Sequence, residues 1–205
     1  MGFYLHRIPS FFHFLFPRHL WRLPNKDNKI FLTFDDGPIP EVTDFVLKSL
    51  GEYSVSATFF LLGEQIEKHQ DLIQKIKNAG HQLANHGYSH LDGRKISRQT
   101  YFENKKRGQA IIDEFDGSSL FRPPYGRFKK GDGVVLWSLM AGDFDKTLSN
   151  EKCLKVLKSK TKSGDIIVFH DNEKSINKLK WVLPRYLQYC VDQGFKFGLI
   201  DQEIC

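Results

Sequence analysis

The 205-residue sequence has few cysteines and no long hydrophobic run, and each absence excludes a class of protein. The three cysteines, Cys153, Cys190 and Cys205, lie far apart without a CxxC pair, which argues against a disulfide scaffold and favours a reducing compartment. The apolar run FFHFLF is interrupted by His13 and closed by Pro17, so it is too short to span a membrane. It also lacks a small-residue cleavage site, and we therefore expect no signal peptide and favour the cytoplasm.

Concentrated charge and repetition are also missing. The net charge is +6, but the Lys and Arg residues are scattered among Asp and Glu, which is typical of solvated helix faces. We therefore predict no nucleic-acid binding. Hydrophobic residues make up 40 % of the chain, with 18 Phe, and no low-complexity segment is present, so the sequence predicts one globular domain. Residues 1–28 form an aromatic and basic N-terminal arm, which we expect to pack on a domain at 29–205; shallow contact with a membrane surface is a weaker alternative.

Beyond residue 29, short apolar runs alternate with helical patterns. The predicted strands lie near 30–34, 57–62, 81–85, 119–122, 134–139, 165–169 and 196–200. The predicted helices cover 41–51, 64–79, 97–115, 150–162 and 177–193. Pro184 predicts that the last helix either kinks or begins there. Because alternating strands and helices build parallel sheets, we predict an α/β fold of about seven strands, either an α/β barrel or a barrel-like sheet.

Titratable side chains collect where these predicted strands end. The first strand ends in Asp35 and Asp36, the third in NHGYSH, the fourth in FRPPYGR, the fifth in AGDFD and the sixth in VFHDN. The carboxyl ends of parallel strands meet on one face of an α/β barrel, where such folds place their ligands. A purely structural chain has little reason to gather these groups, so we predict an active site at this face.

Two histidines and a carboxylate among these residues predict a metal site. His86 and His90 stand four residues apart, so one tight loop can direct both imidazoles at the same point. With one Asp from the first strand they form a three-ligand set with an open position, which is typical of catalytic zinc. Of the adjacent Asp35 and Asp36, one can bind the metal while its neighbour acts as a base.

Further strand ends offer groups for acid and electrostatic catalysis. His170 can donate a proton to a leaving group, and Asp143 can orient its ring and hold its charge. Arg122 can pair with Asp35 and keep it ionised. Pro123 and Pro124 fix the chain before Tyr125, which can then direct a backbone N–H at an oxyanion.

The motifs TFDDGP, NHGYSH, FRPPYG, GDFD and IIVFHD, in this order, resemble the five motifs of the polysaccharide deacetylases, carbohydrate esterase family four, also called the NodB homology domain. The resemblance covers about residues 29–200. It implies a distorted (β/α) barrel that removes acetyl groups from polymers of N-acetylglucosamine or from acetylated xylan, with zinc or another divalent ion. For this chain the expected substrate is an acetylated glycan containing N-acetylglucosamine.

The resemblance also assigns roles by position. It makes Asp35 the base, Arg122 the residue that holds it, and His170 the acid tuned by Asp143. The implied metal ligands are Asp36, His86 and His90, and the implied oxyanion donor is the amide of Tyr125. The sequence departs from the family pattern at Met140, usually Asp, at Phe144, usually Trp, and at Gly87, where Ser or Thr is common. We expect activity with an altered substrate groove.

Three other functions compete with this interpretation. A non-catalytic sugar-binding relative would normally have lost a ligand or catalytic residue, and none is lost here. An amidase of the same fold could act on a small cyclic or ureido substrate, although the RPPYG motif favours sugars. A glycosidase needs two carboxylates about 5–10 Å apart across the scissile bond, which does not suit adjacent Asp35 and Asp36 when one binds metal.

Overall fold

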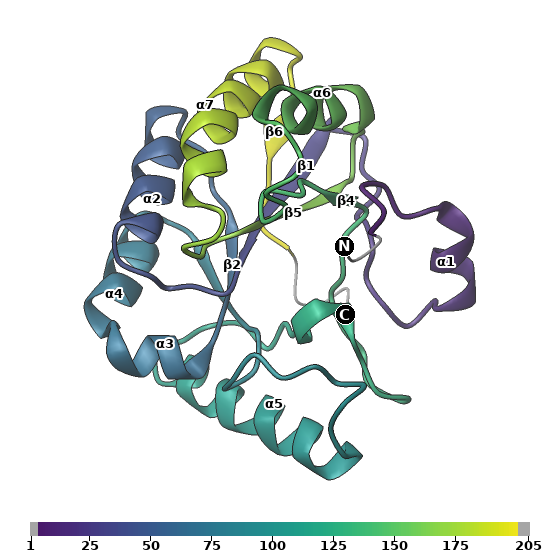
Figure 1. Ribbon diagram of the computed structural model, residues 1–205, viewed down its shortest axis with the longest axis vertical. Helices are drawn as coiled ribbons and strands as arrows, with labels where there is room; N and C mark the ends of the chain where they lie inside the picture. Colours follow the sequence, from purple (N-terminus) through teal and green to yellow (C-terminus); the bar gives the residue numbers. More distant parts are fainter. Residues whose placement is uncertain (1–3, 201–205) are drawn as a thin grey trace.

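The computed structural model describes residues 4–200, which form a twisted parallel sheet surrounded by helices (Figure 1). The strand order is β3-β2-β1-β5-β4, and β6 pairs with the start of β1. The strands are β1 (Lys29–Asp35), β2 (Thr58–Leu61), β3 (Gln82–Asn85), β4 (Leu139–Met140), β5 (Ile166–His170) and β6 (Lys196–Phe197). All of the named pairings are parallel, as predicted from the alternation of strands and helices.

Strand β1 lies at the centre and positions the active site. Its residues from Ile30 to Asp35 are all buried, because helices cover the sheet and a central parallel strand must be apolar on both faces. In register with β5, Asp35 lies beside His170, and in register with β2 it lies beside Phe60. Two predicted site residues therefore meet at the carboxyl ends of adjacent strands.

The two sheet edges approach each other through irregular chain instead of full strands. The predicted strand 119–122 makes a single bridge, Phe121 to Asn85, with the amide of Arg122 donating to the Asn85 carbonyl at 3.0 Å. In the predicted strand 134–139 only Leu139 belongs to β4, while the amide of Val135 donates to the Phe121 carbonyl at 2.8 Å. Prolines 123 and 124 lack an N–H and cannot extend a ladder, which ends the pairing after Arg122. The ring closes as a distorted barrel.

The helices surround the sheet except for the first, which lies to one side in the N-terminal arm and has no buried residue (Figure 1). They are α1 (Ser10–Leu15), α2 (Val42–Glu52), α3 (Gly63–Lys68), α4 (Gln70–Asn78), α5 (Arg98–Asp113), α6 (Asn150–Lys160) and α7 (Ile176–Asp192). The single helix predicted at 64–79 is two helices, separated at His69, whose φ and ψ of −136° and 49° are not helical. Helix α7 begins at Ile176 and continues through Pro184, so a helix start at Pro184 is excluded.

The main core lies between the sheet and the helices on one face. Phe34 stacks on Phe59 and on Phe169, with centroid distances of 5.2 and 5.7 Å, and all three side chains are fully buried. Cys153 and Cys190 belong to the same core as free thiols, and Cys205 lies outside the described residues. Within residues 4–200, no helix is long and apolar enough to cross a membrane.

The N-terminal arm packs along β4 and the residues that precede it. Arg7 forms an antiparallel bridge with Leu139, and the amide of Met140 donates to the His6 carbonyl at 2.7 Å. The guanidinium of Arg7 donates two hydrogen bonds, of 2.7 and 3.0 Å, to the carboxylate of Asp165, which is fully buried. Further along, Leu20 pairs in parallel with Val135. The arm therefore extends the sheet beyond β4.

Candidate active site

A cavity of about 650 Å³ opens at the carboxyl ends of the strands. Its lining includes Asp35, Asp36, His86, His90, Tyr125 and His170. These residues come from β1, from the loop after β3, from the short 3₁₀ turn at Pro124–Gly126 and from the end of β5. Arg122 and Asp143 are buried directly behind this lining. The structure thus brings together all eight residues named from the sequence.

Asp36, His86 and His90 converge on one point. Oδ1 of Asp36 lies 3.4 Å from Nε2 of His86 and 3.2 Å from Nε2 of His90. The φ of Asp36 is 84°, a left-handed conformation that L residues rarely adopt, and it occurs directly where β1 ends. Such strained backbone is tolerated where the surrounding structure fixes it, and it is common at functional sites.

The two histidines are oriented by hydrogen bonds from outside the cluster. Nδ1 of His86 lies 2.7 Å from the Arg122 carbonyl, and because a carbonyl can only accept, Nδ1 carries the proton. Nε2 of His86 therefore presents a lone pair toward Asp36, which is how protein metal sites fix the tautomer of a histidine ligand. The ring of His90 packs edge-on against Tyr125, with centroids 4.4 Å apart.

The loop that carries both histidines is held by Asn104 of α5. The Asn104 side chain accepts a hydrogen bond from the Ser89 amide at 2.9 Å and donates one to the Ser89 carbonyl at 2.9 Å. Gly87 in this loop has a φ of 91°, and a Cβ built there would lie 2.5 Å from Nδ2 of Asn104. The family often has Ser or Thr at position 87. In this protein the left-handed backbone and the side chain of Asn104 leave no room for a side chain there, which explains the glycine.

The three side chains fit a divalent metal ion. The two imidazole nitrogens and the carboxylate oxygen all lie within 4.8 Å of one another. Oδ1 of Asp36 is buried and has no hydrogen-bond partner among the described residues, although buried polar atoms are normally paired. Burial opposes its charge, but the adjacent imidazoles of His86 and His90 hold the pKa of Asp36 well below its usual range. A carboxylate beside two imidazole nitrogens is a donor set suited to a divalent metal ion.

Asp35 points into a different environment from its neighbour. Its Oδ1 accepts a hydrogen bond from Nη1 of Arg122 at 2.6 Å, and both side chains are buried. Arg122 also donates to Thr33 Oγ1 at 2.8 Å and to the Leu136 carbonyl at 3.0 Å, and its guanidinium lies over the Phe60 ring. Burial lowers the pKa of Arg122, while the charge of Asp35 opposes this shift. A guanidinium fixed this firmly pairs with the adjacent carboxylate and fixes its orientation.

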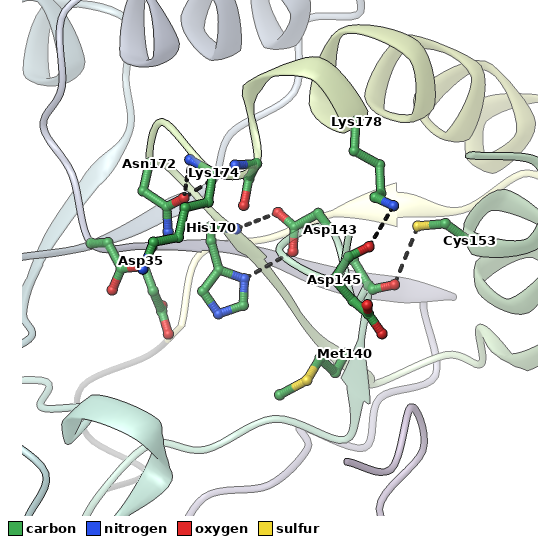
Figure 2. Close-up of polar contacts among 12 residues, drawn as sticks. Asp35, Met140, Asp143, Asp145, Cys153, His170, Asn172, Lys174 and Lys178 are labelled. Atoms are coloured by element: carbon green, nitrogen blue, oxygen red, sulfur yellow. Dashed lines mark hydrogen bonds and ion pairs between the residues drawn. The ribbon is translucent and has the colours of Figure 1, made fainter. Parts of the chain in front are cut away.

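His170 and Asp143 form a close pair, drawn in Figure 2. Nδ1 of His170 donates to Oδ1 of Asp143 at 2.8 Å, and the amide of His170 donates to Oδ2 at 2.7 Å. The other ring nitrogen points away from Asp143 (Figure 2). Burial opposes protonation of the ring, but the charge and hydrogen bond of Asp143, with smaller effects of Asp36 and Asp35, raise the pKa of His170 to about 9. The imidazolium form is therefore populated at neutral pH.

Tyr125 lies at the rim of the cavity with 58 % of its surface exposed. It sits in the turn Pro124–Gly126 with a φ of 59°, so its backbone is also left-handed. Met140 and Phe144, where the sequence departs from the family pattern, line the same cavity. The ring of Phe144 meets the His170 ring edge-on, with centroids 4.9 Å apart.

Two residues at this site were not found by sequence reasoning. Asn172 donates a hydrogen bond from Nδ2 to Oδ2 of Asp36 at 2.6 Å, which leaves Oδ1 facing the histidines. Its position in the sequence, two residues after His170, could have indicated that Asn172 lies at the site. Tyr4 lines the cavity, and its hydroxyl donates to Asp145 at 3.0 Å. The sequence carries no signal for this contact, since the two residues are 141 positions apart.

Comparisons with known proteins agree with this site. The family model described as polysaccharide deacetylase matches residues 22–132. A peptidoglycan-N-acetylglucosamine deacetylase of Bacillus cereus is 28 % identical over 193 residues, covering 89 % of this chain and 91 % of its own. A peptidoglycan-N-acetylglucosamine deacetylase of Listeria monocytogenes is 33 % identical over 188 residues, which cover 86 % of this chain and 39 % of the longer relative.

Solved structures show the same fold. A peptidoglycan N-acetylglucosamine deacetylase in complex with 4-naphthalen-1-yl-N-oxidanyl-benzamide superposes with a TM-score of 0.79 at 27 % identity, covering 92 % of this chain and 94 % of that one. A family 4 carbohydrate esterase from Streptomyces lividans, in complex with acetate, gives a TM-score of 0.75 at 27 % identity, with 85 % and 94 % covered.

The distorted barrel, with a metal-ligand cluster beside a buried carboxylate and a charged histidine, defines a metal-dependent hydrolase. The matched family model spans more than half of the chain. The chain belongs to the polysaccharide deacetylase family, carbohydrate esterase family 4.

Proposed function

We propose that this protein is an N-deacetylase of glycans that contain N-acetylglucosamine. The observation that carries the proposal is the convergence of Asp36, His86 and His90 in a cavity that also holds Asp35 and His170. Removal of an acetyl group needs an activated water, a base, and an acid for the leaving amine, and this cavity contains a group suited to each task. The relatives named as peptidoglycan-N-acetylglucosamine deacetylases support the N-acetyl substrate.

In this proposal, Asp36, His86 and His90 hold the metal, with zinc as the preferred ion. Two nitrogen ligands and one carboxylate at an open site favour zinc over magnesium or calcium, which prefer oxygen ligands. When bound, the ion would polarise the acetyl carbonyl and lower the pKa of a water molecule from about 16 toward about 7. Asn172 would fix the orientation of the Asp36 carboxylate through its 2.6 Å hydrogen bond.

The chain itself supplies the proton transfers. Asp35, paired with Arg122 at 2.6 Å, accepts a proton from the attacking water. The amide of Tyr125 stabilises the oxyanion that develops on the former carbonyl oxygen. His170, charged through its contact with Asp143, then donates a proton to the amine as the C–N bond breaks. This division of work gives each of the adjacent aspartates a separate role.

A panel of substrates tests this function. Acetate release would be measured on N-acetylglucosamine oligomers, peptidoglycan fragments and acetylated xylan, before and after chelation and with zinc returned. We expect release from the N-acetylated glycans that is lost with chelator and restored by zinc. Release from xylan alone would contradict the N-acetyl preference. Turnover of only a cyclic amide or ureide would indicate that the protein is an amidase of the same fold. Glycan binding without any turnover would indicate a non-catalytic sugar-binding protein.

A further inference from the structure

The N-terminal arm exposes a hydrophobic cluster that packing on the barrel does not explain. Five of the eight exposed large hydrophobic side chains in residues 4–200 lie between positions 5 and 16. They are Leu5 at 40 %, Phe11 at 56 %, Phe14 at 85 %, Leu15 at 58 % and Phe16 at 38 % exposure. Scattered exposed hydrophobic residues are normal, but a contiguous group marks an interaction surface. We call Phe11, Phe14 and Leu15 of α1 the hydrophobic tip.

The charge around the hydrophobic tip has one sign. Residues 4–26 contain no Asp or Glu, and their cationic side chains are Arg7, Arg18, Arg22 and Lys26. The acids whose charge reaches His13 and His19 are Asp165 and Asp132. Asp165 is buried and paired with Arg7, and Asp132 is 5 % exposed and paired with Lys105 at 2.6 Å. Arg18 itself is exposed.

A cavity of about 460 Å³ lies beside α1, and its polar walls are cationic or imidazole groups. His13, Arg18, His19, Trp21 and Arg22 are among its lining residues. Three buried atoms of this lining, Nε2 of His13, Nδ1 of His19 and Nε of Arg22, have no hydrogen-bond partner among the described residues. Nε of Arg22 is a donor, and each imidazole can donate from its unpartnered nitrogen in one tautomer, so a wall that lacks acids is suited to an anionic group.

We propose that α1 and this cavity form a docking surface for a bilayer that contains anionic phospholipid. The hydrophobic tip enters the interface between headgroups and acyl chains, and the cationic lining meets the lipid phosphates. Apolar side chains that enter a membrane beside Lys and Arg are the usual elements of peripheral membrane binding. A second copy of this chain is a poorer occupant, because two such surfaces would bring positive charge against positive charge.

Vesicle sedimentation tests the proposal, with the full-length protein and sucrose-loaded vesicles of phosphatidylcholine with or without phosphatidylglycerol. We expect binding to the anionic vesicles that weakens as salt is added. The double variant Phe14→Ser/Leu15→Ser should lose about a hundredfold in binding, because each side chain contributes about tenfold on burial. Arg18→Gln should lose about fivefold.

Matched substitutions on α7, which lies away from α1 in Figure 1, control for general surface effects. Val191 is 45 % exposed and Lys180 is exposed, so Val191→Ser and Lys180→Gln should bind vesicles like the parent. Unchanged melting temperatures show that the variants fold. Absence of binding to anionic vesicles, or equal binding by the Phe14→Ser/Leu15→Ser variant, would overturn the proposal. A dimer in sedimentation velocity that this variant abolishes would instead assign the surface to a second copy.

Discussion

We propose separate roles for the adjacent Asp35 and Asp36 because the backbone directs their side chains into different surroundings. Asp35 is the last residue of β1 and faces Arg122, whereas Asp36 has left the strand with a φ of 84° and faces His86 and His90. In a regular strand, the side chains of consecutive residues would point to opposite faces of the sheet. The turn at Asp36 instead brings both carboxylates into one cavity. The order of the two residues therefore decides which one we expect to bind the metal.

Asparagine substitutions separate these two roles. Asp35→Asn should keep the bound metal and lower turnover by about 10²–10⁴-fold, since it removes a positioned base. Asp36→Asn should lose the metal and, with it, acetate release. Elemental analysis and acetate release on the same preparations measure both effects. Asp145→Asn, a carboxylate that contacts Tyr4 and Thr147, serves as the control. Equal loss of metal in both variants would contradict the assignment.

The charge of His170 predicts the alkaline limb of the rate profile. Because its pKa is raised to about 9, the proton donor is present at neutral pH and is lost as the pH rises through that value. Asp143→Asn removes the largest favourable effect on the charged ring. The limb should then move to lower pH by about 1–3 units, with metal content unchanged.

His170→Ala is the companion variant for this pH measurement. It should lose more activity than Asp143→Asn while still retaining zinc, because the proton donor itself is gone. A pH profile for His170→Ala that matched the parent would assign the acid to another residue.

At the scale of elements, the prediction from sequence succeeded where short-range patterns decide the structure. The buried runs of β1, β2, β3 and β5 were found because apolar residues between turn residues form core strands. The segments at 119–122 and 134–139 were wrong as full strands. Their β-prone residues lie beside Pro123, Pro124 and Gly133, and apart from Leu139 of β4 they pair only through single bridges in the described structure. Contacts such as Tyr4 with Asp145 depend on the tertiary fold, which no local pattern reports.

The loop 86–90 depends on α5 for its shape, and this dependence can be tested. Asn104→Ala removes both hydrogen bonds to the Ser89 backbone and leaves those groups unsatisfied. We expect a loss of about 1–3 kcal/mol in the free energy of unfolding, together with weaker zinc binding, because His90 is no longer fixed. Urea unfolding and a zinc competition assay measure the two effects.

A control for this variant lies on the same helix. Within the described residues, the side chain of Gln99 hydrogen-bonds only to the exposed carboxylate of Glu103. Gln99→Ala should therefore leave zinc affinity unchanged. Zinc affinity that stayed at the parental value in Asn104→Ala would show that the loop holds its shape without α5.

At the scale of the molecule, the N-terminal arm is part of the folded unit. It pairs with β4 and places Tyr4 in the active-site cavity. The boundary between residues 28 and 29 was proposed because a basic, aromatic segment there gives way to apolar runs that alternate with helical patterns. Composition cannot reveal the ion pair between Arg7 and Asp165, which joins the two parts.

Removing this ion pair should destabilise the whole protein. Arg7→Gln leaves the buried carboxylate of Asp165 without its charged partner, which should cost about 2–4 kcal/mol in the free energy of unfolding. Denaturant unfolding of Arg7→Gln and of Arg18→Gln, an exposed residue of the same arm, measures the difference. We expect Arg18→Gln to unfold like the parent; equal stability of all three proteins would show that the arm contributes no stability through Asp165.

The irregular closure of the barrel implies that one side of the active site opens more readily than the other. Asp35 and His170 belong to a complete ladder between β1 and β5, whereas the backbone at 121–122 is paired through isolated contacts. There the Arg122 amide donates to the Asn85 carbonyl and the Val135 amide to the Phe121 carbonyl. Native-state hydrogen exchange should show the amides of Arg122 and Val135 exchanging through local opening, and those of β1 and β5 only through global unfolding. The side of the cavity that carries Arg122 and Tyr125 would then move when a polymeric chain enters, while the side formed by β1 and β5 stays in place.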